Sequence, residues 1–198
     1  MLIEHEGRRP RVDDSAHVAP TAVLCGDVRV GADSRILFGA VLTAETGTIE
    51  VGERCIVMEN ALLRGREPHP VVIGDHVLVG PHAHVNGARI GPEVFLATGV
   101  SVFPGAQIER GSEIRINAVV HVNSRVEPNT TVPIGWIAAG DPAQLFAPEA
   151  HERLWEVQEA MDFPGTVFGL PREEASMDRI CASYAESFGR HRGDRVLD

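Results

Sequence analysis

The stretch from Ile90 to Val132 reads I-GPEVFL-ATGVSV-FPGAQI-ERGSEI-RINAVV-HVNSRV-EPNTTV, and every sixth residue in it is leucine or a β-branched aliphatic residue. A six-residue period matches neither the 3.6-residue period of an α-helix nor the simple alternation of a flat strand. It is typical of a parallel β-helix of hexapeptide repeats, in which each hexad forms one side of a triangular coil. We therefore expect a mainly β protein whose core is a column of these aliphatic side chains.

The same period runs through the first half of the chain, but it breaks three times. Three extra residues enter near Glu45–Glu50, four enter near Gly65–Pro70, and one is missing between Val85 and Ile90. The core of a solenoid must stay stacked, so inserted residues form loops on its outside. Irregular loops on a rigid scaffold commonly carry functional residues. We therefore look for the functional site between residues 43 and 90.

The composition limits the size of the core and the class of partner. The chain has 198 residues and 43% of them are apolar, which is enough for one sizeable core. The formal charge of −10 argues against a nucleic acid or an anionic membrane as partner, because both would repel the protein. Met1–Pro10 has no apolar stretch, so we expect no signal peptide or membrane segment and a cytoplasmic protein.

The repeat divides the chain into two parts. We expect a β-helix over residues 12–144 and a C-terminal helical extension over residues 145–198. The extension carries apolar residues at helical spacing, and such a face needs a surface to cover. That surface is either the side of the chain's own β-helix or a neighbouring subunit.

Within the extension, apolar residues at helical spacing predict a first helix over 149–161. We expect Phe163-Pro164-Gly165 to end this helix and Pro171 to open a second one, because proline suits the first turn of a helix and not its interior. The tail Gly189–Asp198 is expected to be frayed.

Several short motifs distinguish this chain from a generic hexapeptide repeat. They are Phe38-Gly-Ala-Val-Leu42, Ile49-Glu-Val-Gly-Glu-Arg54, Pro70-Val-Val-Ile-Gly-Asp75, Val79-Gly80, Gly140-Asp-Pro-Ala143 and Phe163-Pro-Gly-Thr-Val-Phe-Gly169. Together they resemble the γ-class carbonic anhydrases and their relatives over nearly the whole chain. The resemblance implies a left-handed β-helix that forms a homotrimer, with sites in the clefts between subunits.

The resemblance also implies a zinc ion on three histidines, and this sequence departs from that pattern. The three ligand positions hold Arg64, Pro81 and Asn86. Arginine is a fixed cation and cannot ligate zinc. Glu45 and Glu59 retain carboxylates where the family has aspartate. We therefore do not expect ordinary zinc-dependent hydration of carbon dioxide.

The residues at the lost ligand positions form a candidate substrate-binding site. Alignment of the hexads puts Arg64 and Asn86 on adjacent coils, with the carboxylate of Glu45 available nearby. A guanidinium, an amide and a carboxylate can bind a small anionic molecule through paired hydrogen bonds, and they can stabilise a developing oxyanion. The alternative is that Arg64 only forms an ion pair with Glu45 or Glu59 between subunits.

Glu59, His82 and His84 are the candidate catalytic residues. Ala83 fills an inward slot, so His82 and His84 both project outward beside a lost ligand position. Neutral imidazoles can serve as acid and base, and Glu59 is a further acid or base. Alternatively, His82 and His84 hold a divalent metal such as zinc, with a third ligand from across an interface.

His69 and His76 are further possible partners of His82 and His84, whereas the cysteines and four other histidines are expected to stay out of the chemistry. Cys55 occupies a small inward slot and should pack as an apolar residue, whereas Cys25 faces outward. Four histidines are expected to lie in solvent: His5, His17, His151 and His191.

Three functions remain open. The first is an enzyme, a hydrolase or a lyase, that acts on a small carboxylate or acyl substrate at an intersubunit site. The second is a hexapeptide acyltransferase that uses CoA, with His82 or His84 as the catalytic histidine. The third is a catalytically silent trimeric scaffold or a small-molecule-binding protein.

Overall fold

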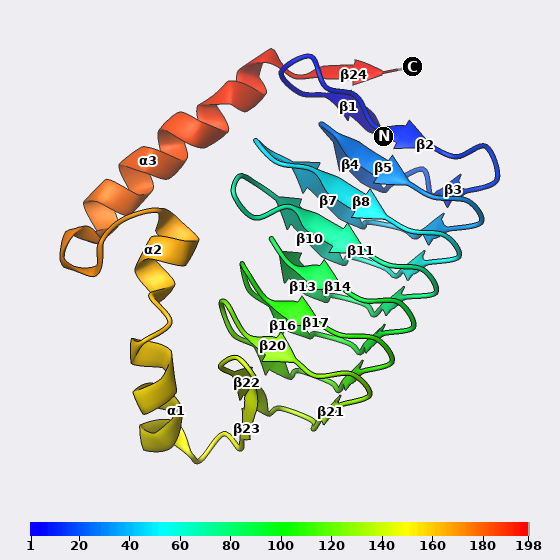
Figure 1. The fold of residues 1–198 in the computed structure, drawn as a ribbon. Coiled ribbons are helices and arrows are strands. Elements are labelled where there is room, and N and C mark those ends of the chain that lie inside the picture. The colour runs from blue at the N-terminus through cyan, green and yellow to red at the C-terminus, as the bar shows by residue number, and fades with distance from the viewer. Residues whose placement is uncertain (198) are drawn as a thin grey trace.

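The hexads wind into a left-handed parallel β-helix, described for residues 1–197 by a computed structural model (Figure 1). Asp198 lies outside the described residues. Each coil contributes one strand to each of three sheets, so a side chain lies directly beside its counterparts on the neighbouring coils. The mainly β fold predicted from the six-residue period is confirmed.

The largest sheet carries the candidate site. In spatial order its ten strands are β23 (Gln144–Phe146), β22 (Ile137–Ala139), β19 (Val119–Val120), β16 (Ser101–Val102), β13 (His84–Asn86), β10 (Leu62–Gly65), β7 (Val41–Ala44), β4 (Val23–Cys25), β1 (Leu2–Glu4) and β24 (Arg195–Leu197). Strands β1 to β22 of this sheet run parallel, whereas β23 and β24 add antiparallel strands at its two edges.

The other two sheets have seven strands each. The second sheet consists of β2 (Arg11–Val12), β5 (Val28–Val30), β8 (Ile49–Val51), β11 (Val71–Ile73), β14 (Arg89–Ile90), β17 (Gln107–Ile108) and β20 (Arg125–Val126). The third consists of β3 (His17–Val18), β6 (Arg35–Ile36), β9 (Ile56–Val57), β12 (Leu78–Val79), β15 (Phe95–Leu96), β18 (Glu113–Ile114) and β21 (Thr131–Val132).

The hexad residues fill the core as their period predicts. Leu63, Leu96 and Val102 are fully buried, and the small slots between them are buried as well. Cys55 fills one of these small slots with no exposed surface, so its predicted packing role is confirmed. The aliphatic columns therefore hold the coils in register, and residues that alternate with them point outward.

The coil corners recur with the same period of six. Every sixth residue in the second half of the chain has a positive φ, a conformation that glycine and asparagine adopt most readily. These corner residues are Glu93, Gly99, Gly105, Gly111, Asn117, Asn123, Asn129 and Gly135. Asparagine side chains lie against glycines of the preceding coil, as Asn123 does at Gly105, where no side chain would fit.

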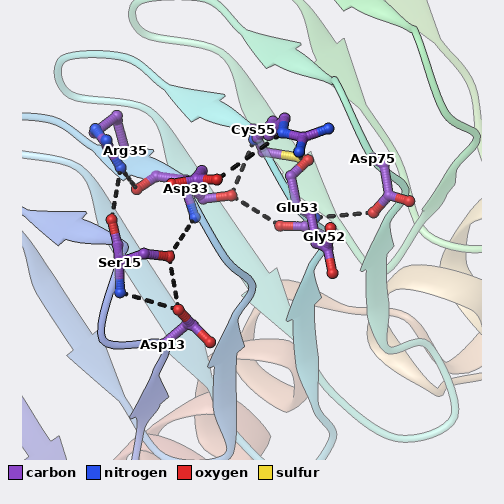
Figure 2. A network of polar contacts seen from close by, with 10 residues as sticks. Asp13, Ser15, Asp33, Arg35, Gly52, Glu53, Cys55 and Asp75 are labelled. Atoms are coloured by element: carbon purple, nitrogen blue, oxygen red, sulfur yellow. Dashed lines mark hydrogen bonds and ion pairs between the residues drawn. The ribbon is translucent and has the colours of Figure 1, made fainter.

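One corner of the N-terminal coils is joined from coil to coil by side-chain hydrogen bonds (Figure 2). Asp13 Oδ1 accepts bonds from the amide and the hydroxyl of Ser15. Ser15 Oγ in turn accepts a bond from the amide of Asp33 on the next coil, at 2.9 Å. Further along, Asp75 Oδ1 accepts a bond from the amide of Glu53 at 2.8 Å. These contacts satisfy corner amides and fix the register of the turns.

The predicted insertions form two loops that lie side by side. One connects Ala44 to Ile49 and the other connects Gly65 to Val71. The amide of Glu67 in the second loop donates to Thr46 Oγ1 in the first at 3.0 Å. Both loops leave the large sheet at the same corner, next to the outward residues of β7 and β10.

The C-terminal helices run back along the outside of the large sheet toward the N-terminal coil (Figure 1). They are α1 (His151–Glu159), α2 (Phe163–Phe168) and α3 (Met177–Gly189), with short 3-10 helices η1 (Arg172–Glu174) and η2 (Arg190–Gly193). In residues 1–197, none of the helices combines the length and the hydropathy needed to cross a bilayer.

Three expectations for this part of the chain are wrong. Phe163-Pro164-Gly165 starts a helix instead of ending one, because the Asp162 side chain accepts a bond from the Gly165 amide at the N-terminus of α2 and proline suits its first turn. Pro171 precedes only η1, and α3 begins later, at Met177. The tail is not frayed, because β24 pairs with β1 and covers the exposed edge of the large sheet.

Replacement of a core hexad residue should destabilise the fold strongly. We expect Leu63→Ala to lower the free energy of unfolding by about 2–5 kcal/mol, because it opens a cavity in a fully buried column. Urea unfolding followed by circular dichroism measures the loss. Leu62→Ala, one residue earlier and pointing outward, is the matched control and should lose less than half as much; equal losses would contradict the assigned register.

Candidate functional site

Four outward residues on successive coils form a column on the large sheet. Cys25 of β4 lies beside Thr43 of β7, Thr43 lies beside Arg64 of β10, and Arg64 lies beside Asn86 of β13. The adjacency of Arg64 and Asn86 that the hexad alignment predicts is therefore present. The column ends at the corner where the two inserted loops leave the sheet.

A cavity of about 180 Å³ lies over this column. The β-helix contributes its floor, the inserted loops one wall, and α3 its cover. Its lining residues are Glu45, Thr46, Arg64, Arg66, Glu67, Asn86, Tyr184, Ser187 and Phe188. The site thus combines three segments that are far apart in the sequence, and the helix that covers it belongs to the same chain.

Three buried polar atoms on residues that line the cavity have no protein partner among residues 1–197. They are Arg64 Nε, Arg66 Nε and Asn86 Oδ1, and all three are shielded from solvent. The guanidinium of Arg64 lies 5.4 Å from the ring centre of Phe188, and its Nε is 3.8 Å from Glu45 Oε1, too far for a hydrogen bond. Buried polar groups are normally hydrogen-bonded, so unpaired donors and an unpaired acceptor on residues of one cavity indicate a place for a small ligand.

Glu45 links the cavity to the C-terminal tail. Its side chain is only 8% exposed, and its Oε2 accepts a hydrogen bond from His191 Nε2 at 3.0 Å. Glu45 thus makes its close contact with His191 and not with Arg64. An ion pair with Glu45 therefore accounts for only part of the surroundings of Arg64. The guanidinium keeps donors for another group.

His84 lies on the same outward face as Asn86, two residues earlier on β13. Its ring packs edge-on against Phe103, with 6.4 Å between ring centres. Burial, reinforced by the positive charge of Arg64, lowers the pKa of His84 below its ordinary value. The imidazole is therefore neutral near pH 7, the state in which it can accept a proton.

Glu59 and His82 lie together at a different place, the corner between the third sheet and the large sheet. His82 is exposed and has a positive φ, and its amide donates to the carbonyl of Glu59 at 3.1 Å. Neither residue lines the cavity over Arg64 and Asn86. Within the part of the chain described, no third histidine, cysteine or carboxylate completes a metal-binding group with His82 and His84.

That corner is apolar for much of its length. Backbone hydrogen bonds stack one corner residue on the next from coil to coil. The residues in this corner column are Phe38, Glu59, Pro81, Thr98, Ile116 and Ile134. Three of them are exposed apolar residues: Phe38, Ile116 and Ile134. Glu59 and His82 are thus polar groups within an exposed apolar edge.

A run of aromatic contacts holds the helices on the large sheet. Phe163 of α2 packs on Phe103 and on His121, in each case with 5.7 Å between ring centres. Arg66 of the second inserted loop donates to the carbonyls of Thr166, at 2.8 Å, and Val167. These contacts fix α2, and through it α3, over the cavity.

A second cluster, not expected from the sequence, lies at the edge of the same sheet. His5, Cys25, His191 and Asp194 bring their side-chain donor atoms together there. The expectation that His5 and His191 lie in solvent is wrong, because β24 draws the tail across β1; His5 is 2% exposed. No sequence signal marks this cluster, since its members meet only through the pairing of the two chain ends. Burial and the neighbouring Asp194 raise the pKa of the outward-facing Cys25 thiol to about 12.

The zinc ion implied by the resemblance does not fit the residues at the corresponding positions. Arg64 presents only donors and a fixed positive charge, and Asn86 is its register partner on the next strand. Pro81 has no ligand atom. No step of the chemistry can therefore be assigned to a zinc ion at these three positions.

Sequence comparison relates the chain to carbonic anhydrases. No protein-family model matches it. It is 30% identical to γ carbonic anhydrase 1, mitochondrial, of Arabidopsis thaliana over 153 residues, which cover 74% of this chain and 54% of the relative. It is 27% identical to a carbonic anhydrase of Geobacillus kaustophilus over 158 residues, which cover 80% and 84% of the two chains. The chain spans about half the length of the first of these curated relatives.

Structural comparison agrees with the fold. A hexapeptide transferase family protein from Anaplasma phagocytophilum superimposes with a TM-score of 0.54 at 24% identity, over 93% of this chain and 96% of that one. The class is therefore that of the left-handed β-helix proteins built from hexapeptide repeats. Within this class the chain is a γ-carbonic-anhydrase-like protein, in which arginine, proline and asparagine stand at the positions expected for the zinc ligands.

The lowered pKa of His84 predicts how stability depends on pH. The unfolded chain takes up a proton on this histidine at a higher pH than the folded chain does. The contribution of the neutral histidine to the free energy of unfolding is therefore fully present above the pKa of the unfolded chain, and it is lost as the pH falls through the pKa of the folded chain. Between about pH 8 and about pH 5, the free energy of unfolding of His84→Gln should fall less than that of the wild type. His17→Gln, at an exposed position, is the control and should follow the wild type; a parallel fall in all three would contradict a half-buried neutral His84.

Proposed function

We propose that the protein is a small-molecule enzyme whose substrate carries a carboxylate or acyl group bound between Arg64 and Asn86. The observation that carries the proposal is the pair of unpaired buried polar atoms, Arg64 Nε and Asn86 Oδ1, in one covered cavity. A cavity of about 180 Å³ favours a molecule of a few heavy atoms. The reaction class that fits best is hydrolysis or elimination, hence a hydrolase or a lyase.

The polar groups of the site suit a ligand that carries an oxygen anion and, close to it, a hydrogen-bond donor. Arg64 can donate two parallel hydrogen bonds to a carboxylate or to the oxyanion of an acyl intermediate. Asn86 Oδ1 would accept a bond from a hydroxyl or amide group of the same molecule. Glu45 keeps the guanidinium oriented from the other side, at 3.8 Å. The substrate we infer therefore has an acceptor and a donor close together.

Proton transfer would use His84, Glu59 and His82. His84 is on the same sheet face as Asn86 and is neutral near pH 7, so among the three it is the one on the same strand as a cavity residue. Glu59 and His82 would act from a neighbouring subunit. We propose a homotrimer in which the apolar corner column of one subunit lies against the large sheet of the next.

The exposed apolar surface supports this assembly. A groove of about 390 Å³ lies along the third sheet and the corner column, and its apolar lining includes Met58, Leu78, Phe95, Ile116 and Ile134. Exposed apolar patches of this kind commonly mark interfaces between protein chains. The same contact would bring Glu59 and His82 beside a cavity that a single chain leaves without them.

The other functions considered for this sequence predict different behaviour. A CoA-dependent acyltransferase would bind CoA saturably, and the structural likeness at 24% identity supports the fold alone. A silent scaffold would show no dependence on Arg64 beyond its effect on assembly. A divalent metal on His82 and His84 would be lost from a His82→Ala/His84→Ala variant.

Arg64→Ala should weaken ligand binding while the fold persists. We expect small carboxylates (acetate, glycolate and malonate) to bind the wild type in NMR titrations and to bind Arg64→Ala about 10- to 100-fold more weakly, the loss of a charged hydrogen bond of roughly 1.5–3 kcal/mol. Arg89→Ala, an exposed arginine on the second sheet, is the control and should bind as the wild type. If the two variants bound the carboxylates with equal affinity, the proposed site would be wrong.

A charge in the corner column should break the assembly. Light scattering should give the wild type a mass three times that of the 21.4 kDa chain, and Ile134→Asp should give the mass of a single chain because it buries a charge in an apolar contact. Val196→Asp, at an equally exposed apolar residue on β24, should remain trimeric. A monomeric wild type would rule out the shared site.

A further inference from the structure

Four side chains with metal-binding atoms converge at the N-terminal end of the large sheet. His5 follows β1, Cys25 ends β4, His191 lies in η2 and Asp194 precedes β24. One donor atom from each lies within 4.8 Å of the donor atoms of the other three. Among the described residues this is the one group of three or more such side chains. It lies outside the cavity over Arg64 and Asn86.

The distances between the donor atoms are those of hydrogen bonds, and they are close to the distances between ligand atoms in a tetrahedral metal site. Asp194 is the common partner: its Oδ1 is 2.6 Å from His5 Nδ1, and its Oδ2 is 2.8 Å from His191 Nδ1 and 3.5 Å from Cys25 Sγ. Zinc bonds of about 2.0–2.3 Å imply donor atoms roughly 3.3–3.8 Å apart. Outward shifts of about 1 Å or less would therefore convert these hydrogen bonds into ligand bonds.

Burial and ring orientation distinguish this group from a surface cluster. His5 is 2% exposed and Cys25 is 4% exposed. The imidazoles of His5 and His191 are stacked, with 4.3 Å between ring centres and 28° between ring planes. Both rings direct Nδ1 at the same carboxylate, so four donor atoms point into one small volume instead of toward solvent.

A second carboxylate orients one of the histidines. Glu45 Oε2 accepts a hydrogen bond from His191 Nε2 at 3.0 Å, and the Glu45 side chain is 8% exposed. On metal binding His191 would release its Nδ1 proton to solvent, keep the proton on Nε2 and present the lone pair of Nδ1 to the cation. Histidines that bind metals commonly donate their other ring nitrogen to a carboxylate in this way.

We propose that His5, Cys25, His191 and Asp194 bind one Zn²⁺ ion per chain. Two imidazole nitrogens, a thiolate and a carboxylate oxygen form a donor set that suits zinc, whereas Ca²⁺ and Mg²⁺ require ligands that are all or nearly all oxygen. Cys25 Sγ binds as the thiolate and releases its proton to solvent. The site has four protein ligands, which is typical of a structural and not a catalytic ion.

The ion would fasten the two ends of the chain to each other. His5 comes from the first coil and Cys25 from the second, whereas His191 and Asp194 come from the segment that follows α3. Since Phe188 of α3 covers the substrate cavity and Glu45 contacts both His191 and Arg64, the metal site also holds the cover of the cavity in place. The alternative is a hydrogen-bonded clasp, in which the same four side chains hold the two chain ends together by hydrogen bonds alone, without a metal ion.

The test uses the full-length chain, stripped with a chelator and then titrated with zinc chloride. We expect one Zn²⁺ per chain by elemental analysis and a rise in the melting temperature on zinc addition. Cobalt substitution should give a thiolate-to-Co²⁺ charge-transfer absorption that is absent in Cys25→Ser. Cys181→Ser, which changes an exposed cysteine of α3, is the matched control and should retain stoichiometric zinc and the cobalt absorption.

Two further variants separate the outcomes. Asp194→Asn and His191→Ala should fold, as judged by circular dichroism, and should lose both the bound zinc and the zinc-dependent rise in melting temperature. His82→Ala/His84→Ala should keep the bound zinc and the zinc-dependent rise in melting temperature, since His82 and His84 lie outside the cluster. Zinc that persists in Cys25→Ser and His191→Ala, or a wild type that binds none, would overturn the proposal and leave the hydrogen-bonded clasp. Neither result depends on carboxylate binding at Arg64.

Discussion

The stacking of coils in register is the constraint on which the rest of this structure depends. Parallel strands lie about 4.8 Å apart, so each outward residue stands one strand spacing from its counterparts. The aliphatic columns hold this register because a shift by one residue would turn them out of the core. As a result Thr43, Arg64 and Asn86 form a straight column although they are about 20 residues apart in the chain.

The candidate site is formed where this regular surface is interrupted. The two inserted loops raise a wall beside the column, and α3 covers it with Tyr184 and Phe188. Arg64 is held between the carboxylate of Glu45 and the ring of Phe188, and neither takes its Nε proton in a hydrogen bond. A partly exposed cation with a shielded, unused donor is suited to an anionic ligand.

The repeat allowed much of this to be predicted from the sequence. The aliphatic period predicts the coils, the three breaks in it predict the loops, and the alignment of hexads predicts that Arg64 and Asn86 are neighbours. The sequence analysis failed where the chain leaves the repeat. Phe163-Pro164-Gly165 was expected to end a helix, because proline and glycine punctuate helices at both ends and only the Asp162 cap identifies this end as a start.

The sequence by itself determined the core, the coil corners and the order of residues along each face, because a short period leaves one way to bury its apolar positions. Only the tertiary structure decided which residues are covered. Outward residues such as Cys25 look solvated in any single coil, and His5 and His191 belong to no repeat. They become neighbours, with His5 and Cys25 buried and His191 partly buried, because β24 pairs with β1 across nearly the full length of the chain. Contacts between such distant segments leave no local pattern in the sequence.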